Sequence, residues 1–356
     1  MAEQITAQQR AQLFAMSTRQ NLQMLAKQTA NTGASTLQFN LPKARLLSKS
    51  IVHFKGKVNV KHASKTSIPT SEFTIYKAIR RISLDLNNGF SPFVCTGEEL
   101  ALYNMLDKNG SIMSKASNYR STEKTGTFTA NASGKDNDID FYLELPVTIN
   151  PRDPIGLILL QNSETNVDLT VDTCNGIEMF DDTDVTGFTV ELKNVEVSVC
   201  CETFSIPSNT NAYPDLSVIK LVNGRTDALA SAGQQVVKMS TGTIYRKIIL
   251  YFEKADGTPM SNEEIGNIEI VFNQADVNYN ISPDMLRAIN TKDLGFELPK
   301  GVYIFDFSSG GNITNYGGTR DYIDTEKLTE FWIRTTTTTT ATGSVKVVSE
   351  CLARLH

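Results

Sequence analysis

Histidines are the side chains of this chain best suited to acid–base or metal chemistry, and there are three of them. His53 and His62 lie nine residues apart, and His356 is the last residue. A catalytic triad or a zinc site needs a nucleophile or further ligands that converge on a histidine. The sequence nominates no such partner, so we expect no histidine-based catalysis and predict that the chain is not an enzyme.

Closely spaced carboxylates are a second possible source of chemistry, because they can bind calcium. Asp181, Asp182 and Asp184 follow one another in a segment typical of a turn. Counted from Asp182, the EF-hand pattern is met at Gly187 but fails at its twelfth position, where Lys193 replaces the bidentate glutamate. We interpret this segment as a solvated acidic loop.

Four other polar stretches are interpreted without chemistry. Residues 133–140 are expected to form an exposed loop between strands, and the glycine-rich residues 308–312 and 316–318 form turns, because neither has the order of a phosphate-binding loop. The six threonines of residues 335–340 favour a strand, which we expect to end in a β-hairpin turning at residues 341–343.

The five cysteines form no CxxC pair and no even framework, so we predict reduced, buried, structural thiols, no metal and no cofactor. They are Cys95, Cys174, Cys200, Cys201 and Cys351.

Charge is sorted along the chain. Residues 1–71 carry ten Lys or Arg and a single acid, Glu3, for a net charge of +9, whereas residues 72–356 carry −14. This sorting predicts a positive side that favours an anionic partner such as lipid headgroups or nucleic acid. Aromatic side chains that could stack on bases are scarce in the basic part, so no direct sequence-specific contact with nucleic acid is predicted.

The basic N-terminus is predicted to be helical. Residues 5–30 contain no Gly or Pro and are rich in Gln, Ala, Leu, Met and Arg, which are strong helix formers. The helix should face a lipid surface or a neighbouring subunit, although a solvated helix followed by a strand with outward lysines is the alternative. The candidate contact residues are Arg10, Leu13, Phe14, Met16, Arg19, Met24 and Lys27, with Lys43, Arg45 and Lys49 as a basic inner face.

From about Leu37 onward, short runs with period two, bounded by Gly, Pro, Asn, Asp and Ser, indicate strands. Only short helices are expected among them, for example at residues 97–106 and 283–288. The expected strands are residues 51–60, 79–86, 141–147, 156–160, 167–172, 188–192, 195–199, 248–252, 268–272, 302–307, 331–338 and 344–352.

These strands are too many for one sandwich and lack a βαβ alternation, so the sequence predicts an all-β chain with two tandem antiparallel sandwiches, of the Ig, jelly-roll or related kind, after an N-terminal helix. Two jelly rolls of ordinary domain size agree with the chain length. The polar, proline-containing residues 205–214 are the best boundary. The expected units are residues 1–36 (basic helix and arm), 37–206 (first jelly roll) and 207–356 (second jelly roll). No apolar stretch long enough for a membrane helix and no signal peptide is present, which predicts a protein made and kept in the cytosol.

Three segments carry a family resemblance. The hexapeptide Leu298, Pro299, Lys300, Gly301, Val302 and Tyr303, the Gln/Ala/Leu segment of residues 7–28, and residues 213–216 resemble, in the same order, segments of the major capsid protein of tectiviruses, tailless phages with a membrane inside an icosahedral shell.

The resemblance implies a structural protein of the virion. It implies two jelly rolls side by side in each subunit, a homotrimer shaped as a pseudo-hexagonal capsomer, and an N-terminal helix at its base facing the internal membrane. The implied partners are further copies of the chain, the membrane lipids, and the minor capsid, vertex and membrane proteins of the virion.

Two other functions compete with a shell protein. A phage spike or another carbohydrate- or receptor-binding β-sandwich would need exposed aromatic platforms, and the single Trp332 lies in an expected strand. A jelly-roll hydrolase would need two paired carboxylates, and the acidic residues show no such pattern.

Overall fold

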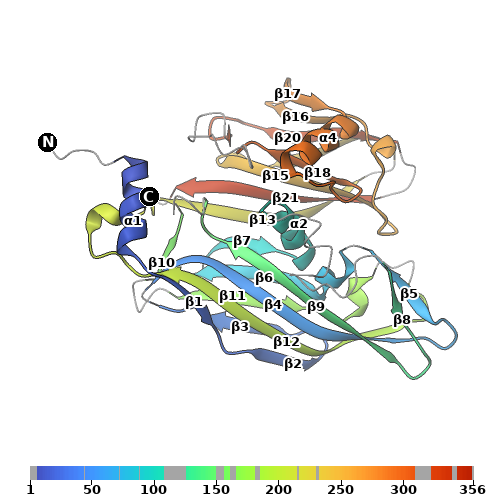
Figure 1. Ribbon diagram of the computed structural model, residues 1–356. Helices are drawn as coiled ribbons and strands as arrows, with labels where there is room; N and C mark the ends of the chain where they lie inside the picture. Colours follow the sequence, from blue (N-terminus) through green and yellow to red (C-terminus); the bar gives the residue numbers. More distant parts are fainter. Residues whose placement is uncertain are drawn as a thin grey trace.

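The computed structural model describes residues 6–43, 45–71, 73–87, 89–107, 126–149, 156–160, 166–180, 185–214, 216–229, 232–308, 322–338 and 343–354. These residues form two β-sandwiches that lie side by side with their long strands running in the same general direction (Figure 1). The all-β prediction is confirmed. The expected strands are found, several of them longer than expected.

The N-terminal helix is shorter than predicted. Helix α1 covers Ala7–Ser17, where Thr6 and Gln9 form a capping box, and Thr18 is already extended. The chain then continues as strands β1 (Gln20–Met24) and β2 (Gln28–Thr32). The prediction of helix through residue 30 is therefore wrong beyond Ser17, because pairing with a long neighbouring strand outweighs a helix propensity of a few tenths of a kcal/mol per residue.

The outer sheet of the first sandwich has six strands. Strands β1 and β2 both pair with one edge of β12, which pairs on its other side with β4, and β4 also pairs with β9 and β10. The bounds are Thr189–Phe204 for β12, Arg45–Lys61 for β4, Lys135–Pro146 for β9 and Ile158–Leu160 for β10. The loop predicted at residues 133–140 is wrong from Lys135 onward, because its acidic side chains belong to a strand that faces the lysines of β4.

A nine-stranded sheet runs through both sandwiches. Its strands in spatial order are β18 (Val302–Asp306), β15 (Ile244–Lys254), β21 (Gly343–Arg354), β13 (Val218–Leu229), β7 (Phe90–Cys95), β6 (Ile79–Leu86), β11 (Val167–Thr173) and β3 (Thr36–Asn40), with β19 (Ile323–Asp324) on β15. The halves meet where β7 pairs in parallel with β13, with Val222 opposite Phe93 and Asn223 opposite Val94.

Two smaller sheets complete the fold. The second sandwich is closed by β14 (Gly233–Met239), β20 (Phe331–Thr337), β16 (Ile268–Phe272) and β17 (Asp276–Ile281), and a two-stranded sheet joins β5 (Ser67–Thr70) to β8 (Gly126–Thr129). The threonine run does end a strand, β20, but the predicted hairpin is wrong. Strand β20 pairs with β14 and β16, whereas β21 lies in the nine-stranded sheet.

Short helices lie between the strands, and both predicted ones are confirmed as α2 (Gly97–Asp107) and α4 (Pro283–Leu294). The described 3₁₀ helices are η1 (Thr74–Ala78), η2 (Ile177–Met179), η3 (Thr210–Ala212) and η4 (Asn262–Glu264).

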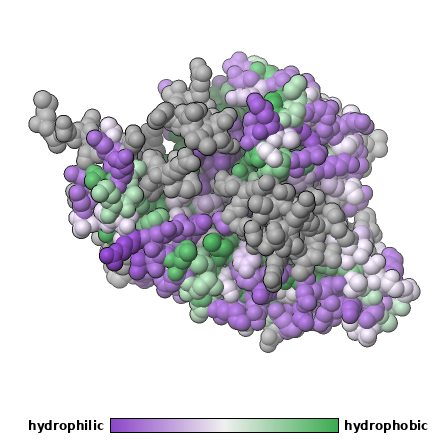
Figure 2. Space-filling model, viewed as in Figure 1, coloured by the Kyte–Doolittle hydropathy of each residue, from purple (hydrophilic) through white to green (hydrophobic). Residues whose placement is uncertain are grey.

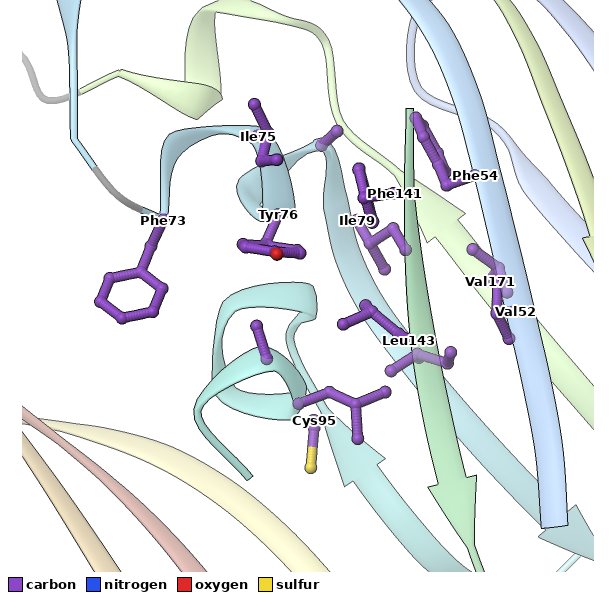
Figure 3. Packing of buried hydrophobic residues seen from close by; sticks show 14 of the residues in the cluster. Val52, Phe54, Phe73, Ile75, Tyr76, Ile79, Cys95, Phe141, Leu143 and Val171 are labelled. Carbon is purple, nitrogen blue, oxygen red and sulfur yellow. The ribbon is translucent and has the colours of Figure 1, made fainter. Parts of the chain in front are cut away.

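Each sandwich has an apolar core. In the first, Phe54 and Phe141 stack with their ring centroids 4.9 Å apart, and Tyr76 meets Phe141 edge-on at 5.0 Å (Figure 3). A second cluster fills the other sandwich, and every residue in it lies beyond residue 228. The cores explain why inward positions along the strands are apolar.

Candidate functional site

The structure brings one acid–base pair together that the sequence did not nominate. His53 on β4 and Asp140 on β9 lie with Nε2 2.7 Å from Oδ1, and the ring of Tyr142 stacks on the imidazole at 4.0 Å. Lys55 also lies 3.7 Å from the Asp140 carboxylate. The His53–Asp140 contact therefore cross-links β4 and β9.

The other sequence-based chemical candidates are either structural or outside the described residues. The Nδ1 atom of His62 accepts hydrogen bonds from the backbone N–H groups of Ser64 and Lys65, which shapes a turn. His356, the three aspartates at 181, 182 and 184, and most of the glycine-rich segments lie outside the described residues. Within the described ranges, no three His, Cys, Asp or Glu side chains gather as a metal site would require.

The cysteines behave as small core residues. Cys95, Cys174, Cys201 and Cys351 are buried, and Cys200 is half-buried. Burial raises the pKa of the Cys174 and Cys201 thiols to about 11. The thiolate form that reacts and binds metals is therefore strongly disfavoured.

Helix α1 is fastened to the end of the first sandwich by one aromatic side chain. Phe14 is buried among Leu46 and Leu157, and its ring meets that of Phe204 edge-on at 5.3 Å. Met16 points away and is 86% exposed. The predicted contact residues of this helix therefore divide: Phe14 holds the helix in place, and Met16 remains on the surface.

Most lysines of the predicted basic side are neutralised locally. Lys49 lies 3.7 Å from Glu144 and 3.6 Å from Glu202, and Lys27 lies 3.1 Å from Glu196. Strands β9 and β12 thus place acids from the second part of the sequence beside the lysines of β4. The charge sorted along the chain is largely mixed in space on this face.

A group of cations remains at the end of the sandwich that carries α1. The Arg19 backbone exchanges hydrogen bonds with Ser205, and Arg45 stands two strands away across β12, roughly 10 Å at ordinary strand spacing. Arg10 is half-buried in α1, and Lys43 donates to Asn166 at 3.2 Å. Helix α1 and the end of β21 lie at this end (Figure 1).

The family-like hexapeptide forms a structural turn that leads into β18. Gly301 has φ +80°, and a Cβ there would lie 2.7 Å from the Phe252 carbonyl oxygen, so only glycine fits. Leu298 is buried, and Tyr303 donates to Asn262 Oδ1 at 2.7 Å. The motif therefore connects α4 to β18 and belongs to the fold rather than to a binding surface.

The two sandwiches are joined through buried charges. Lys346 on β21 binds Glu98 of α2 at 2.8 Å and Glu253 at 2.5 Å. Burial acts to lower the pKa of Lys346, but the two carboxylates raise it more. For Glu253 burial dominates and raises the pKa.

A second buried group lies beside it. Glu350 on β21 accepts from Tyr103 of α2 and lies 3.1 Å from Arg246. Burial alone would raise the pKa of Glu350, but the charges of Lys247, Lys220 and Arg246 lower it to about 2. The joint between the sandwiches is therefore built from α2, β13 and β21.

Exposed apolar side chains gather in two places. Figure 2 shows them over the β1 end of the six-stranded sheet, and apolar atoms also reach the surface near β17 and α4. The large exposed residues there are Leu22 and Met24 on β1, and Val277, Tyr279, Met285 and Ile289 on β17 and α4. Trp332, by contrast, is half-buried with the Lys238 ammonium 5.9 Å from its ring, so it is no open platform for sugar.

No helix in the described part of the chain is both long and apolar enough to cross a membrane.

Solved structures share this architecture along nearly the whole chain. A structure of Sulfolobus Turreted Icosahedral Virus matches with a TM-score of 0.66 and 13% identity over 94% of this chain and 91% of that one. The faustovirus major capsid protein matches at 0.61 and 10% over 95% and 90%, and the major capsid protein P2 of bacteriophage PM2 at 0.57 and 9% over 95% and 98%. No family model and no curated protein matches the sequence. The double jelly-roll fold is thus confirmed.

Proposed function

We propose that this chain is the major capsid protein of an icosahedral virus, a structural subunit without catalytic activity. The observation that carries the proposal is the double jelly-roll fold, which matches major capsid proteins end to end rather than over one sandwich. The site geometry agrees, because the described histidines, carboxylates and cysteines hold strands and sandwiches together. The virion capsid is then the location of the protein, after assembly in the host cytoplasm.

The working unit that we propose is a homotrimer. Two sandwiches side by side in each chain give six in a trimer, and six similar bodies around a threefold axis approximate a hexagon that can tile a facet. Within this proposal the arm spans residues 1–36, the first jelly roll residues 37–206 and the second residues 207–356.

Light scattering coupled to size exclusion tests the trimer. Three chains of 39.3 kDa predict a mass of about 118 kDa. A mass of one chain at every protein concentration would overturn the proposal.

We further propose that the end carrying α1 faces an internal membrane, as in a tectivirus-type virion. Met16 supplies an exposed apolar side chain, and Arg10, Arg19 and Arg45 supply positive charge, each worth about 1 kcal/mol near anionic lipid. Minor capsid, vertex and membrane proteins would be neighbours in the shell. Sequence-specific contact with nucleic acid is not part of the proposal.

Vesicle flotation tests the membrane-facing end. Arg19→Glu combined with Arg45→Glu should weaken binding to vesicles containing phosphatidylserine by about tenfold or more, since each reversal removes one attraction and adds one repulsion. Lys27→Glu is the matched control, because Lys27 lies beside Glu196 away from this end. Equal flotation of all three proteins would contradict the assignment.

A further inference from the structure

The two sandwiches repeat the same hairpin and helix unit. In the first sandwich the unit is β6, β7 and α2, and in the second it is β16, β17 and α4. Asn87 and Asn273 turn the two hairpins with φ values of +49° and +48°. Each side chain accepts a backbone N–H from the chain just before the next strand of its sheet, Asn166 in one case and Thr329 in the other.

The helices of the unit are fastened in the same way. The eighth residue of α2 is Asn104, and the eighth residue of α4 is Asn290. Asn104 donates to the Glu144 carbonyl and accepts from its N–H, both at 2.8 Å. Asn290 makes the same two hydrogen bonds with Ile304, at 2.8 and 3.0 Å. Residues of the two units therefore correspond one to one.

The long strands correspond as well. Glu202 on β12 lies opposite Lys49, and Glu350 on β21 lies opposite Lys247, each next to an irregularity in the register. On the other edges of these strands, β1 pairs with β12 and β13 pairs with β21. Leu22 lies opposite Glu202 and Val222 opposite Glu350, so β1 is the counterpart of β13.

Within one chain, the first unit is covered by β13. Phe93 of β7 pairs with Val222, and Glu99 of α2 lies so close to Gly224 that a Cβ on this glycine would collide with the carboxylate. Tyr103 of α2 donates to Glu350. Phe93, Glu99 and Tyr103 are each at most 3% exposed.

The counterparts in the second unit have no such cover in the described chain. Tyr279 stands at the place of Phe93, Met285 at that of Glu99 and Ile289 at that of Tyr103, and they are 41%, 57% and 41% exposed. Among the described strands, β17 pairs only with β16, which leaves one edge open. On β1, Leu22 and Met24 are the counterparts of Val222 and Gly224, and both are 62% exposed.

We propose that β1 of one copy adds in parallel to β17 of a second copy and repeats between chains the joint that β13 and β7 make within one. Leu22 then lies opposite Tyr279 of the neighbouring copy, and Met24 packs on its Met285. This proposal rests on the trimer of the proposed function and assigns its seam. Because the two surfaces differ and lie on opposite sandwiches, the contact is head-to-tail and can close a ring of three.

The proposed contact also explains two features that would harm an isolated chain. An open strand edge with exposed apolar side chains invites aggregation. Strand addition satisfies the free backbone groups of that edge, and the flanking side chains fix the register. In the proposed seam, the apolar contact of Met24 with Met285 takes the place of the contact between Glu99 and Gly224. The carboxylate of Asp284 on α4 would meet no like charge from the N-terminal segment, because residues 5–70 contain no acid.

Disulfide trapping tests the register. Directly opposite residues on paired strands fall in the Cα separation of 4.4 to 6.8 Å that a disulfide needs. Under mild oxidation, Leu22→Cys combined with Tyr279→Cys should give a covalent trimer of about 118 kDa on a denaturing gel. Leu22→Cys combined with Val236→Cys is the matched control, because Val236 is exposed on β14, at the opposite edge of the same sheet.

Charge exchange gives a second measurement. Met24→Lys and Met285→Glu should each raise the protein concentration at half-dissociation about tenfold or more, since each buries an unpaired charge, and the double variant should recover much of the loss. Suppose that the wild type is a trimer, that the double-cysteine variant gives no covalent product and that the double charge variant shows no recovery. This combination would overturn the seam alone. A monomeric wild type would overturn the proposed function and the seam together.

Discussion

Replacing Glu350 with Gln should destabilise the joint between the sandwiches strongly at neutral pH. The Glu350 side chain is almost fully buried beside Arg246 and Tyr103, and its pKa of about 2 lies well below the ordinary glutamate value of 4.5. At 1.36 kcal/mol per unit, the folded state favours the charged form by about 3 kcal/mol. Gln keeps the shape but leaves the facing cations without their carboxylate.

The sign of the pH dependence follows from the lowered pKa. The stabilisation is fully present above the unfolded pKa of 4.5 and is lost as the pH falls toward 2. At pH 7 the variant should therefore unfold roughly 5 °C or more below the wild type in a thermal scan, and the two proteins should converge near pH 2.

Glu202→Gln is the matched control for this experiment. Glu202 is the counterpart of Glu350 on β12 and contacts Lys49 at 3.6 Å, but its side chain is more exposed. Its replacement should cost about 1 kcal/mol or less. Equal midpoints of Glu350→Gln and the wild type at pH 7, or an unchanged gap at pH 2, would refute the reasoning.

Three further substitutions test the internal contacts. Gly301→Ala should lower the free energy of unfolding by about 2 kcal/mol in denaturant titration, because the site has positive φ and no room for a Cβ; an unchanged midpoint would contradict the proposed strain. Asn290→Ala should cost about 3 kcal/mol, since it leaves the buried N–H and C=O of Ile304 unpaired, and a loss below 1 kcal/mol would show that water replaces the amide. Phe14→Ala should weaken the docking of α1 by about 3 kcal/mol and speed proteolysis after residue 18, while the main unfolding transition stays in place.

Strand periodicity predicted most of the fold because the sheets have one buried and one polar face. The alternation at residues 167–172 and 195–199 corresponds to alternating burial in β11 and β12. Two jelly rolls followed from the number of strands and the absence of βαβ units. The features that went wrong all depend on partners distant in sequence.

The N-terminal segment shows this dependence most clearly. Its Gln, Ala and Leu content favours a helix, and only the edge of β12 makes residues 20–24 and 28–32 extended. Residues 135–140 look like a solvated loop because their acids are close together in sequence, yet β4 places Lys55 opposite Asp140 and Lys57 opposite Asp138. The hairpin predicted for the threonine run would pair two strands that are consecutive in the sequence, whereas β20 and β21 lie in different sheets.

The repeated hairpin and helix unit can be recognised in the sequence from residue spacing, which composition alone does not reveal. Asn87 and Asn104 are separated by the same interval as Asn273 and Asn290, and an internal comparison of the two halves would have found this repeat. The repeat in the sequence could not predict that Phe93 is buried whereas its counterpart Tyr279 is exposed. They depend on which strand lies against each unit.

Electron microscopy of the purified oligomer tests the central claim most directly. If three chains form one capsomer, class averages viewed down the symmetry axis should show six lobes in a hexagonal outline, with threefold rather than sixfold symmetry once aligned. Particles with two lobes, or rings that contain six chains, would contradict the account.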